Sequence, residues 1–256
     1  GAAASKGVAQ SQGGATSAFT LCWDSPLRGG EIGWCIPSPI EPALYNAGGP
    51  ITTGGASLDW LLRSLLHSSA DYETALAGAE GVQAAAQGLL FYPYLAGEEL
   101  TLGRDVRGMF LGLGIEHTSD HLIRAVLEGV ALAGRSILES LLAAGGLVYE
   151  VWTYGGQARS GLWNQIKANV WNRPVVIPRV RHAGCLGAAA IAAVGVGEYP
   201  SLSAASQGMA QRGQCYLPHP DQAALYDEAY RAYRRIGLRA RELSVDLGAL
   251  RKDSER

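Results

Sequence analysis

Apolar residues recur along this chain at two spacings, and the two spacings predict alternating strands and helices. Apolar and aromatic runs at 18–23 and 31–36, with a shorter run at 43–45, are separated by stretches that contain glycine or proline. This arrangement is typical of an antiparallel meander. By contrast, apolar residues three and four apart at 57–66 and 118–142 predict a short helix and a long one.

The second half of the chain repeats the change from strand to helix. The segment 149–170 begins with a β-rich run, turns at Gly155-Gly156 and continues with apolar residues at helical spacing. Residues 174–178 predict a buried strand, and 89–92 predict a strand that Pro93 ends. Further helices are predicted at 71–77, 81–87, 184–194, 201–211 and 220–243. The order indicates an α/β domain with a mixed five-stranded sheet and helices on both faces.

Small residues suggest where the chain is loose and where it packs tightly. Residues 1–17 are small, polar and rich in glycine, so we expect a flexible loop that leads into the first strand. Residues 96–108 predict a surface loop. Gly129 and Gly134 lie inside the long helix, where glycine costs up to about 1 kcal/mol relative to alanine. We therefore expect both glycines to allow close packing against the sheet.

Composition narrows the classes of function. Of the 256 residues, 48% are hydrophobic and 17% are charged, and the net charge is −2. These values describe a globular protein without an electrostatic preference for nucleic acid or for an anionic membrane. The long helix also carries Arg124, Glu128, Arg135 and Glu139, which a membrane-spanning helix would bury at high cost. We expect a core helix, and neither a nucleic-acid nor a membrane partner.

Cysteine and histidine spacing predicts neither a disulfide framework nor a metal cage. The cysteines form no CxxC pair and the sequence shows no signal peptide, so we expect reduced thiols in a cytoplasmic protein. The histidines do not cluster with carboxylates at metal-ligand spacing. A metal that enters with a phosphate ligand stays open.

Three glycine-rich turns are the candidate ligand site: 13–17 before the first strand, 54–57 at a helix start, and 155–158. If the turns converge, their backbone N–H groups and hydroxyls suit phosphates and their flat backbone suits a purine. Alternatively, the 34 glycines simply occupy turns, and from the turns alone this second interpretation has somewhat more weight. No Walker A, GxGxxG or GxSxG motif occurs, which disfavours P-loop, Rossmann and hydrolase sites.

Other polar residues offer weaker alternatives for chemistry. Ser160 has no histidine near it in the sequence, which favours a structural or ligand-contacting role over a nucleophile. Glu98-Glu99 could act as an acid–base pair, but adjacent acids in a polar loop are usually only solvated. His117 and His121 stand four apart at a helix start, where capping and surface roles are favoured over metal binding.

Longer motifs resemble a known family. Gly108–Leu113, seven residues and then His121–Gly129 resemble the second signature of the FGGY carbohydrate kinases, in the C-terminal half of the xylulokinase-like branch. The segment 149–170 resembles the adenosine motif of that family, and Ala15-Thr16-Ser17 resembles its phosphate hairpin. Gly55–Leu61 resembles its segment beside the adenine. Similar matches at 92–98 and 184–189 extend the resemblance over nearly the whole chain.

The resemblance implies an actin-like ATPase (ribonuclease H-like) fold, with residues 1–256 as the C-terminal ATP-binding domain of a two-domain sugar kinase. Gly1–Gly7 matches the family's Asp-x-Ala-Ala-x-x-x-Gly motif from the residue after its catalytic aspartate. The general base would thus immediately precede Gly1, and the N-terminal sugar-binding domain is absent. ATP would be bound with Mg²⁺ carried on its phosphates. The implied nucleotide contacts are Thr16, Gly55, Asp59, Gly156, Gln157 and Ser160.

The expected function is therefore ATP-dependent phosphorylation of a sugar, with the ketose D-xylulose as first choice. A glycerol or gluconate kinase and a non-catalytic actin-like scaffold are the alternatives, and the oligomeric state, a homodimer included, stays open. Four departures from the family pattern leave the substrate and the activity open, namely Ala15, Gln157, Asn169 and the run Glu99-Leu100-Thr101.

Overall fold

A mixed sheet of seven strands forms the centre of the computed structural model, which describes residues 5–97, 100, 106–180 and 182–254. The strand order is β3-β4-β2-β1-β7-β8-β9. β1 pairs parallel with β7, and β7 with β8, whereas the remaining neighbours are antiparallel. The strands are β1 (Val8–Gly13), β2 (Ser17–Trp23), β3 (Trp34–Pro37), β4 (Tyr45–Ile51), β7 (Glu150–Gly155), β8 (Val175–Pro178) and β9 (Arg212–Tyr216).

The mixed α/β architecture is confirmed, but the predicted five strands are too few. β1 lies within the segment predicted as a flexible loop, and it is a central strand with partners on both sides. Its buried residues are Ala9, Ser11 and Gly13, so its alternation is one of small residues that a hydrophobic pattern does not reveal. β9 is largely exposed and is held by backbone pairing at the sheet edge.

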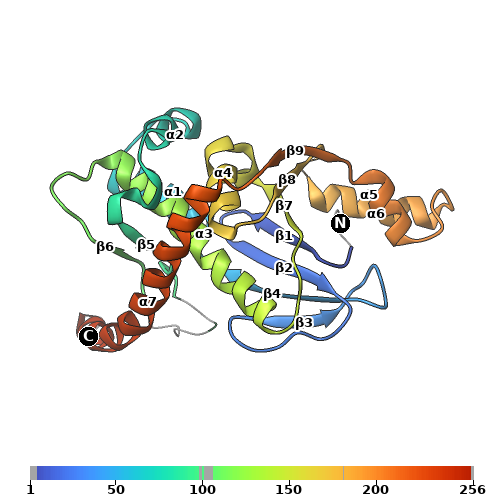
Figure 1. Ribbon diagram of the computed structural model, residues 1–256, viewed down its shortest axis with the longest axis horizontal. Coiled ribbons are helices and arrows are strands. Elements are labelled where there is room, and N and C mark those ends of the chain that lie inside the picture. The colour runs from blue at the N-terminus through green and yellow to red at the C-terminus, as the bar shows by residue number, and fades with distance from the viewer. Residues whose placement is uncertain (1–4, 98–99, 101–105, 181, 255–256) are drawn as a thin grey trace.

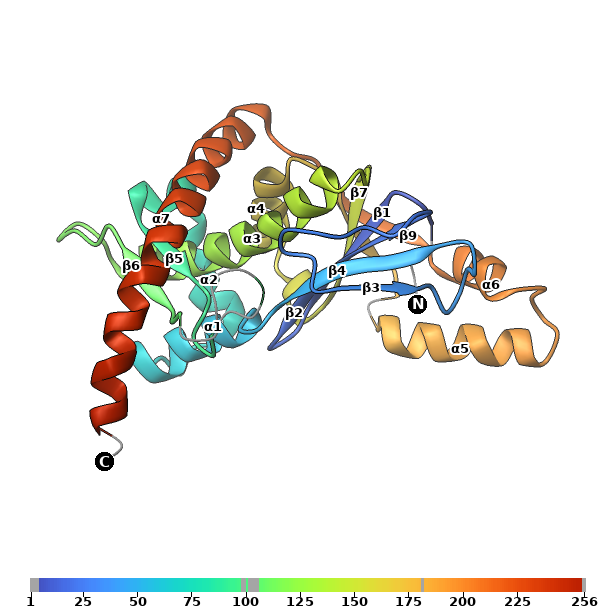
Figure 2. The same ribbon diagram turned by 90° about the horizontal axis from the view of Figure 1, so that it is seen from below.

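Helices cover both faces of the sheet, as predicted (Figure 2). α3 (Ser119–Ala143) and α4 (Gly161–Trp171) pack on one face, and α5 (Ala183–Gly195) lies on the other. Because side chains alternate along a strand, Val151 of β7 joins the main core whereas Trp152 packs with Leu186 of α5. α6 (Leu202–Met209) follows α5 and packs against it.

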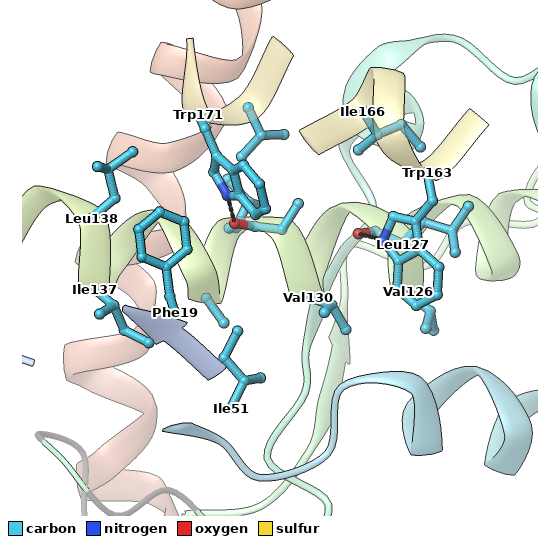
Figure 3. Close-up of a cluster of buried hydrophobic side chains, with 14 of the residues drawn as sticks. Phe19, Ile51, Val126, Leu127, Val130, Ile137, Leu138, Trp163, Ile166 and Trp171 are labelled. Atoms are coloured by element: carbon cyan, nitrogen blue, oxygen red, sulfur yellow. Dashed lines mark hydrogen bonds between the residues drawn. The ribbon is translucent and has the colours of Figure 1, made fainter. Parts of the chain in front are cut away.

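Two tryptophans fasten α4 to α3 (Figure 3). The indole N–H groups of Trp163 and Trp171 donate to the carbonyl oxygens of Leu127 and Ala131, at 3.0 and 2.9 Å. The ring of Phe19 on β2 meets Trp171 edge to face, with centroids 5.3 Å apart. The contacts join both helices to the sheet.

A second group of elements lies to one side of the sheet (Figure 1). α1 (Gly55–Trp60) continues as a π-helical turn at Leu61–Leu65, and α2 (Tyr72–Glu80) follows. β5 (Leu90–Tyr92) pairs with β6 (Met109–Leu111) in a separate two-stranded sheet. The predicted surface loop at 96–108 falls partly, and Glu98-Glu99 wholly, outside the described residues.

The predicted helix at 81–87 is wrong: α2 already ends at Glu80, and residues 81–83 are not helical. Residues Ala84–Gly88 form a turn in which Ala85, Ala86 and Gln87 have φ angles of 62°, 41° and 56°. These are left-handed values, so the segment cannot continue a right-handed helix. The Ala85 N–H donates to the carboxylate of Glu128 at 3.1 Å, which helps to hold the turn in place.

The C-terminal helix is longer than predicted. α7 (Pro220–Ser254) crosses the molecule beside α4 and the left-handed turn (Figure 1). Tyr226 and Tyr233 of α7 are buried, and the ring of Tyr233 stacks on Tyr92 with centroids 4.3 Å apart. No helix in the described part of the chain combines the length and apolar character needed to cross a membrane.

Gly129→Ala is expected to destabilise the domain although alanine favours helix. An added Cβ would lie 2.2 Å from the carbonyl oxygen of Phe91, so β5 would have to move. Overpacking of this kind costs about 1–3 kcal/mol, against a helix gain of about 1 kcal/mol, which leaves a net loss of about 1 kcal/mol. The expected close packing is thus confirmed at Gly129, although its neighbour is β5 rather than the main sheet.

Gly134→Ala is the matched control in the same helix. There the nearest atom, the indole nitrogen of Trp171, is 3.3 Å from an added Cβ. Trp171 would have to shift by only a few tenths of an ångström, so the helix gain of about 1 kcal/mol should offset most of the cost and the loss should be smaller than at Gly129. Urea unfolding of both variants measures the difference. Equal losses at the two positions would contradict this account.

Candidate functional site

The three glycine-rich turns converge at one edge of the sheet. Gly13 at the end of β1 is paired in register with Gly155 at the end of β7. The N–H of Gly55, at the start of α1, donates to the carbonyl oxygen of Gly14 at 2.8 Å, and the next N–H, that of Ala56, donates to Ala15 at 3.0 Å. The condition set by the sequence for a ligand site is therefore met.

Gln157 joins the turns to one another. Its side-chain Nε2 donates to the Ser17 hydroxyl at 2.9 Å and to the carbonyl oxygen of Gly14 at 3.3 Å. Gln157 is only 5% exposed, and Gly13 packs so closely that a Cβ there would lie 2.7 Å from that of Gln157. The glutamine that replaces a common family glycine thus cross-links the hairpin 13–17 to the turn 155–158.

Lys167 of α4 lies behind this glutamine, and sequence reasoning missed it. Its Nζ donates to Gln157 Oε1 at 2.9 Å and lies 5.2 Å and 5.9 Å from the ring centroids of Trp163 and Trp171. Lys167 is 1% exposed, and burial lowers its pKa to about 7. Within the described residues no carboxylate forms an ion pair with it. The available signal was a lysine four residues from each tryptophan, on the apolar face of α4.

Thr16 and Gly156 face outward from the converged turns. Thr16 is exposed at the hairpin tip, where its carbonyl oxygen accepts the N–H of Gly14 at 3.0 Å. Its hydroxyl has no hydrogen-bond partner among the described residues. Gly156 is exposed, and an added Cβ would meet no atom within 4 Å. Packing in this structure therefore does not explain a glycine at 156.

The other predicted contacts already have partners within the protein. Ser160 Oγ accepts the N–H of Trp163 at 3.1 Å and caps α4. The exposed carboxylate of Asp59 accepts the Tyr72 hydroxyl, and this hydrogen bond raises the pKa of Tyr72. Gly55 is half-buried, with its N–H bonded to the hairpin. Thr16, Gly55, Gly156, Gln157 and Ser160 belong to the converged turns or follow them directly, whereas Asp59 lies one helical turn further along α1.

Metal ligands are not clustered in the described ranges, where no group of three or more histidine, cysteine, aspartate or glutamate side chains could hold an ion. The predicted capping role is confirmed for His121, whereas His117 bonds within the turn that precedes the helix. His121 Nδ1 accepts the N–H of Thr118 at 3.2 Å, and His117 Nδ1 accepts that of Gly114 at 2.8 Å. The predicted surface role is wrong for His117, whose side chain is almost fully buried.

Asn169, where the family commonly has aspartate, has a structural role. Its Oδ1 accepts the backbone N–H of His219 at 2.9 Å, and its Nδ2 donates to Gln222 Oε1 at 2.6 Å. The amide thus connects α4 to the start of α7. An aspartate could not make the second bond as a donor.

Comparison with known protein families assigns the chain to a family. The sequence profile of the C-terminal domain of the FGGY family of carbohydrate kinases matches residues 16–196. The chain belongs to this family. A xylulose kinase of Staphylococcus epidermidis is 31% identical over 209 residues, which cover 80% of this chain and 42% of the relative. A gluconokinase of Bacillus subtilis is 35% identical over 204 residues, which cover 75% and 40%.

Solved structures of FGGY kinases share the fold. The xylulose kinase of Rhodospirillum rubrum superposes with a TM-score of 0.84 at 27% identity, covering 94% of this chain and 48% of that one. The gluconate kinase of Lactobacillus acidophilus gives 0.81 at 27% identity, covering 90% and 47%. The expected actin-like fold is therefore confirmed. The chain spans less than half the length of these relatives.

Proposed function

We propose that this chain is the ATP-binding half of a sugar kinase that phosphorylates D-xylulose. The observation that carries the proposal is the convergence of three glycine-rich turns, with Thr16 and Gly156 facing outward. Exposed backbone and hydroxyl groups of this kind suit a nucleotide's phosphates, and a glycine without neighbours suits close approach of the adenosine. Gly55, Gln157 and Ser160 would then shape the site from behind, and Asp59 would lie at the nucleoside side.

The second half of the reaction would depend on residues outside this chain. Phosphoryl transfer needs a positioned γ-phosphate, and a carboxylate to accept the proton of the attacking hydroxyl. By its motif, the residue before Gly1 would be that aspartate. Mg²⁺ would arrive on the phosphates and neutralise their charge. This chain's own part is to bind and orient the nucleotide.

The outer face of α5 is a candidate contact surface for a partner domain. α5 is apolar nearly all round, and only Leu186 and Ala190 are buried. Ile191 is among the exposed large hydrophobic residues, as is Val196 just beyond the helix. Because exposed apolar patches of this kind mark interaction surfaces, we propose that this face packs against the sugar-binding domain.

Gluconate is the second candidate substrate, because the chain also resembles a gluconokinase. The gluconokinase of Bacillus subtilis is 35% identical to this chain, and the xylulose kinase of Staphylococcus epidermidis is 31% identical to it. A coupled assay of ADP release by the full-length protein, with D-xylulose, gluconate and glycerol, separates the candidates. The highest kcat/KM should be with D-xylulose. Turnover of none of the three, with a residue other than aspartate before Gly1, would favour a non-catalytic scaffold. Residues 1–256 alone should bind ATP weakly and phosphorylate no sugar.

Gly156→Leu is expected to weaken ATP binding about tenfold or more without loss of stability. The side chain would project into the space proposed for the nucleotide, and it meets no protein atom at its Cβ. Gly81→Leu is the matched control, since Gly81 is also exposed, with no atom closer than 3.7 Å to an added Cβ, but lies at the end of α2. Isothermal titration of both variants with ATP measures the effect. Equal affinities for ATP would overturn the site.

A further inference from the structure

Lys167 occupies an unusual place for a lysine. Its side chain is enclosed by the core, between two tryptophan rings, and its described polar contact is with the Gln157 amide oxygen at 2.9 Å. Burying an ammonium group without a carboxylate is costly, and a methionine or leucine would fill such a position without that cost. Folding alone therefore gives no reason for a lysine here.

The hydrogen bonds of Gln157 connect this lysine to the surface of the site. The amide has one accepting end and one donating end. The accepting end faces the ammonium of Lys167, and the donating end faces the hairpin, where Nε2 lies 2.9 Å from Ser17 Oγ and 3.3 Å from the Gly14 oxygen. The same Gly14 oxygen accepts the N–H of Gly55 from α1. One relay of bonds therefore runs from Lys167 to all three turns.

We propose that Lys167 is a positioning residue for the nucleotide site: its ammonium fixes the orientation of the Gln157 amide, which holds the hairpin 13–17 against the turn 155–158. This inference rests on the proposed function, in which ATP binds at these turns. Without a donor at 167, the amide can rotate by half a turn. Its oxygen would then face the Gly14 carbonyl oxygen, and two acceptors repel one another. The hairpin that presents Thr16 would lose its hydrogen bonds to the Gln157 side chain.

Lys167→Met tests the role, because methionine keeps the length and removes the donor. We expect ATP affinity, measured by isothermal titration of the full-length protein, to fall about five- to twentyfold, while the unfolding temperature at pH 7 does not fall. KM for the sugar should be unchanged, since the relay ends at the nucleotide turns. Lys167→Arg, which restores a donor, should recover part of the lost affinity.

A double-mutant cycle makes the test independent of how well Lys167→Arg fits. If Lys167 acts through Gln157, then Gln157→Leu and the double variant Gln157→Leu/Lys167→Met should have the same ATP affinity. Additive losses would overturn the relay, as would a Lys167→Met protein that binds ATP like the wild type. An affinity loss that only accompanies a lower unfolding temperature would also overturn it, because it would indicate a purely structural role.

The experiment also separates this inference from the proposed function. A wild-type protein that does not bind ATP overturns both the nucleotide site and the role of Lys167. A wild-type protein that binds ATP, together with a Gly156→Leu variant that does not, supports the site. In that background, an unchanged Lys167→Met affinity overturns the positioning role alone.

Discussion

Glu128→Ala is expected to destabilise the domain by about 3–5 kcal/mol, the usual effect of removing one partner from a buried ion pair. Glu128 is 3% exposed, and its Oε1 accepts Arg124 Nε at 2.6 Å and the Tyr226 hydroxyl at 2.6 Å. It also accepts the Ala85 N–H. The variant would leave the buried Arg124 without its counter-charge and the left-handed turn without its acceptor. Urea unfolding followed by circular dichroism measures the loss.

Glu139→Ala is the internal control, because Glu139 forms the same kind of pair with Arg135 further along α3. The carboxylate side chain is 42% exposed, so water screens the interaction and the change should be below about 1 kcal/mol. Arg135 also keeps Asp227 as a partner. If both glutamate variants lose the same stability, burial is not what makes the Arg124–Glu128 pair important.

Lys167→Met is expected to make the domain about 2 kcal/mol more stable at pH 7. Burial lowers the pKa of Lys167 from 10.5 to about 7. Each pKa unit corresponds to 1.36 kcal/mol, which sets an upper limit of about 5 kcal/mol on the gain from removing the lysine. Leaving Gln157 Oε1 without a donor costs about 1–3 kcal/mol of that. The gain in stability and the expected loss of ATP affinity would therefore have opposite signs.

The pH dependence of this effect has a defined direction. Between pH 10.5 and about 7 the unfolded chain takes up a proton on Lys167 that the folded chain does not. The wild type should therefore lose stability as the pH falls through this range, and the loss should end below about pH 7. The difference between Lys167→Met and wild type should be smaller at pH 9 than at pH 7, as measured by urea unfolding. A difference independent of pH would show that Lys167 is not the titrating group.

The strong hydrophobic periods predicted the main elements. The long helix was predicted at 118–142 and found at Ser119–Ala143, and the strand-turn-helix at 149–170 is present as β7, its turn and α4. Each of these elements buries a regular apolar face, so the spacing of its apolar residues in the sequence is enough to predict it. β1 was missed because its buried residues, Ala9, Ser11 and Gly13, are all small and give no strong hydrophobic alternation. The left-handed turn was missed because alanine favours right-handed helix unless tertiary contacts override it.

The meeting of the glycine-rich turns could be anticipated from the sequence, but the hydrogen bonds between them could not. Glycine-rich turns and family motifs indicated which backbone segments would meet, and the structure brings them together. The sequence could not show that the side chain of Gln157 bonds to the hairpin 13–17 or that the side chain of Ser160 caps α4. Lys167 was not singled out, since the sequence alone does not say which side of α4 faces the turns.

The pairing of β1 with β7 has a consequence for biosynthesis. Val8 lies beside Glu150 and Gly13 beside Gly155. β1 is therefore synthesised well before β7, the strand with which it pairs. At 5–20 residues per second, a ribosome takes on the order of ten seconds to make the intervening chain. During this time one edge of β1 has no native neighbour and could pair with another nascent chain. We expect chaperone binding to the nascent chain to persist until the second of these strands has left the ribosomal tunnel.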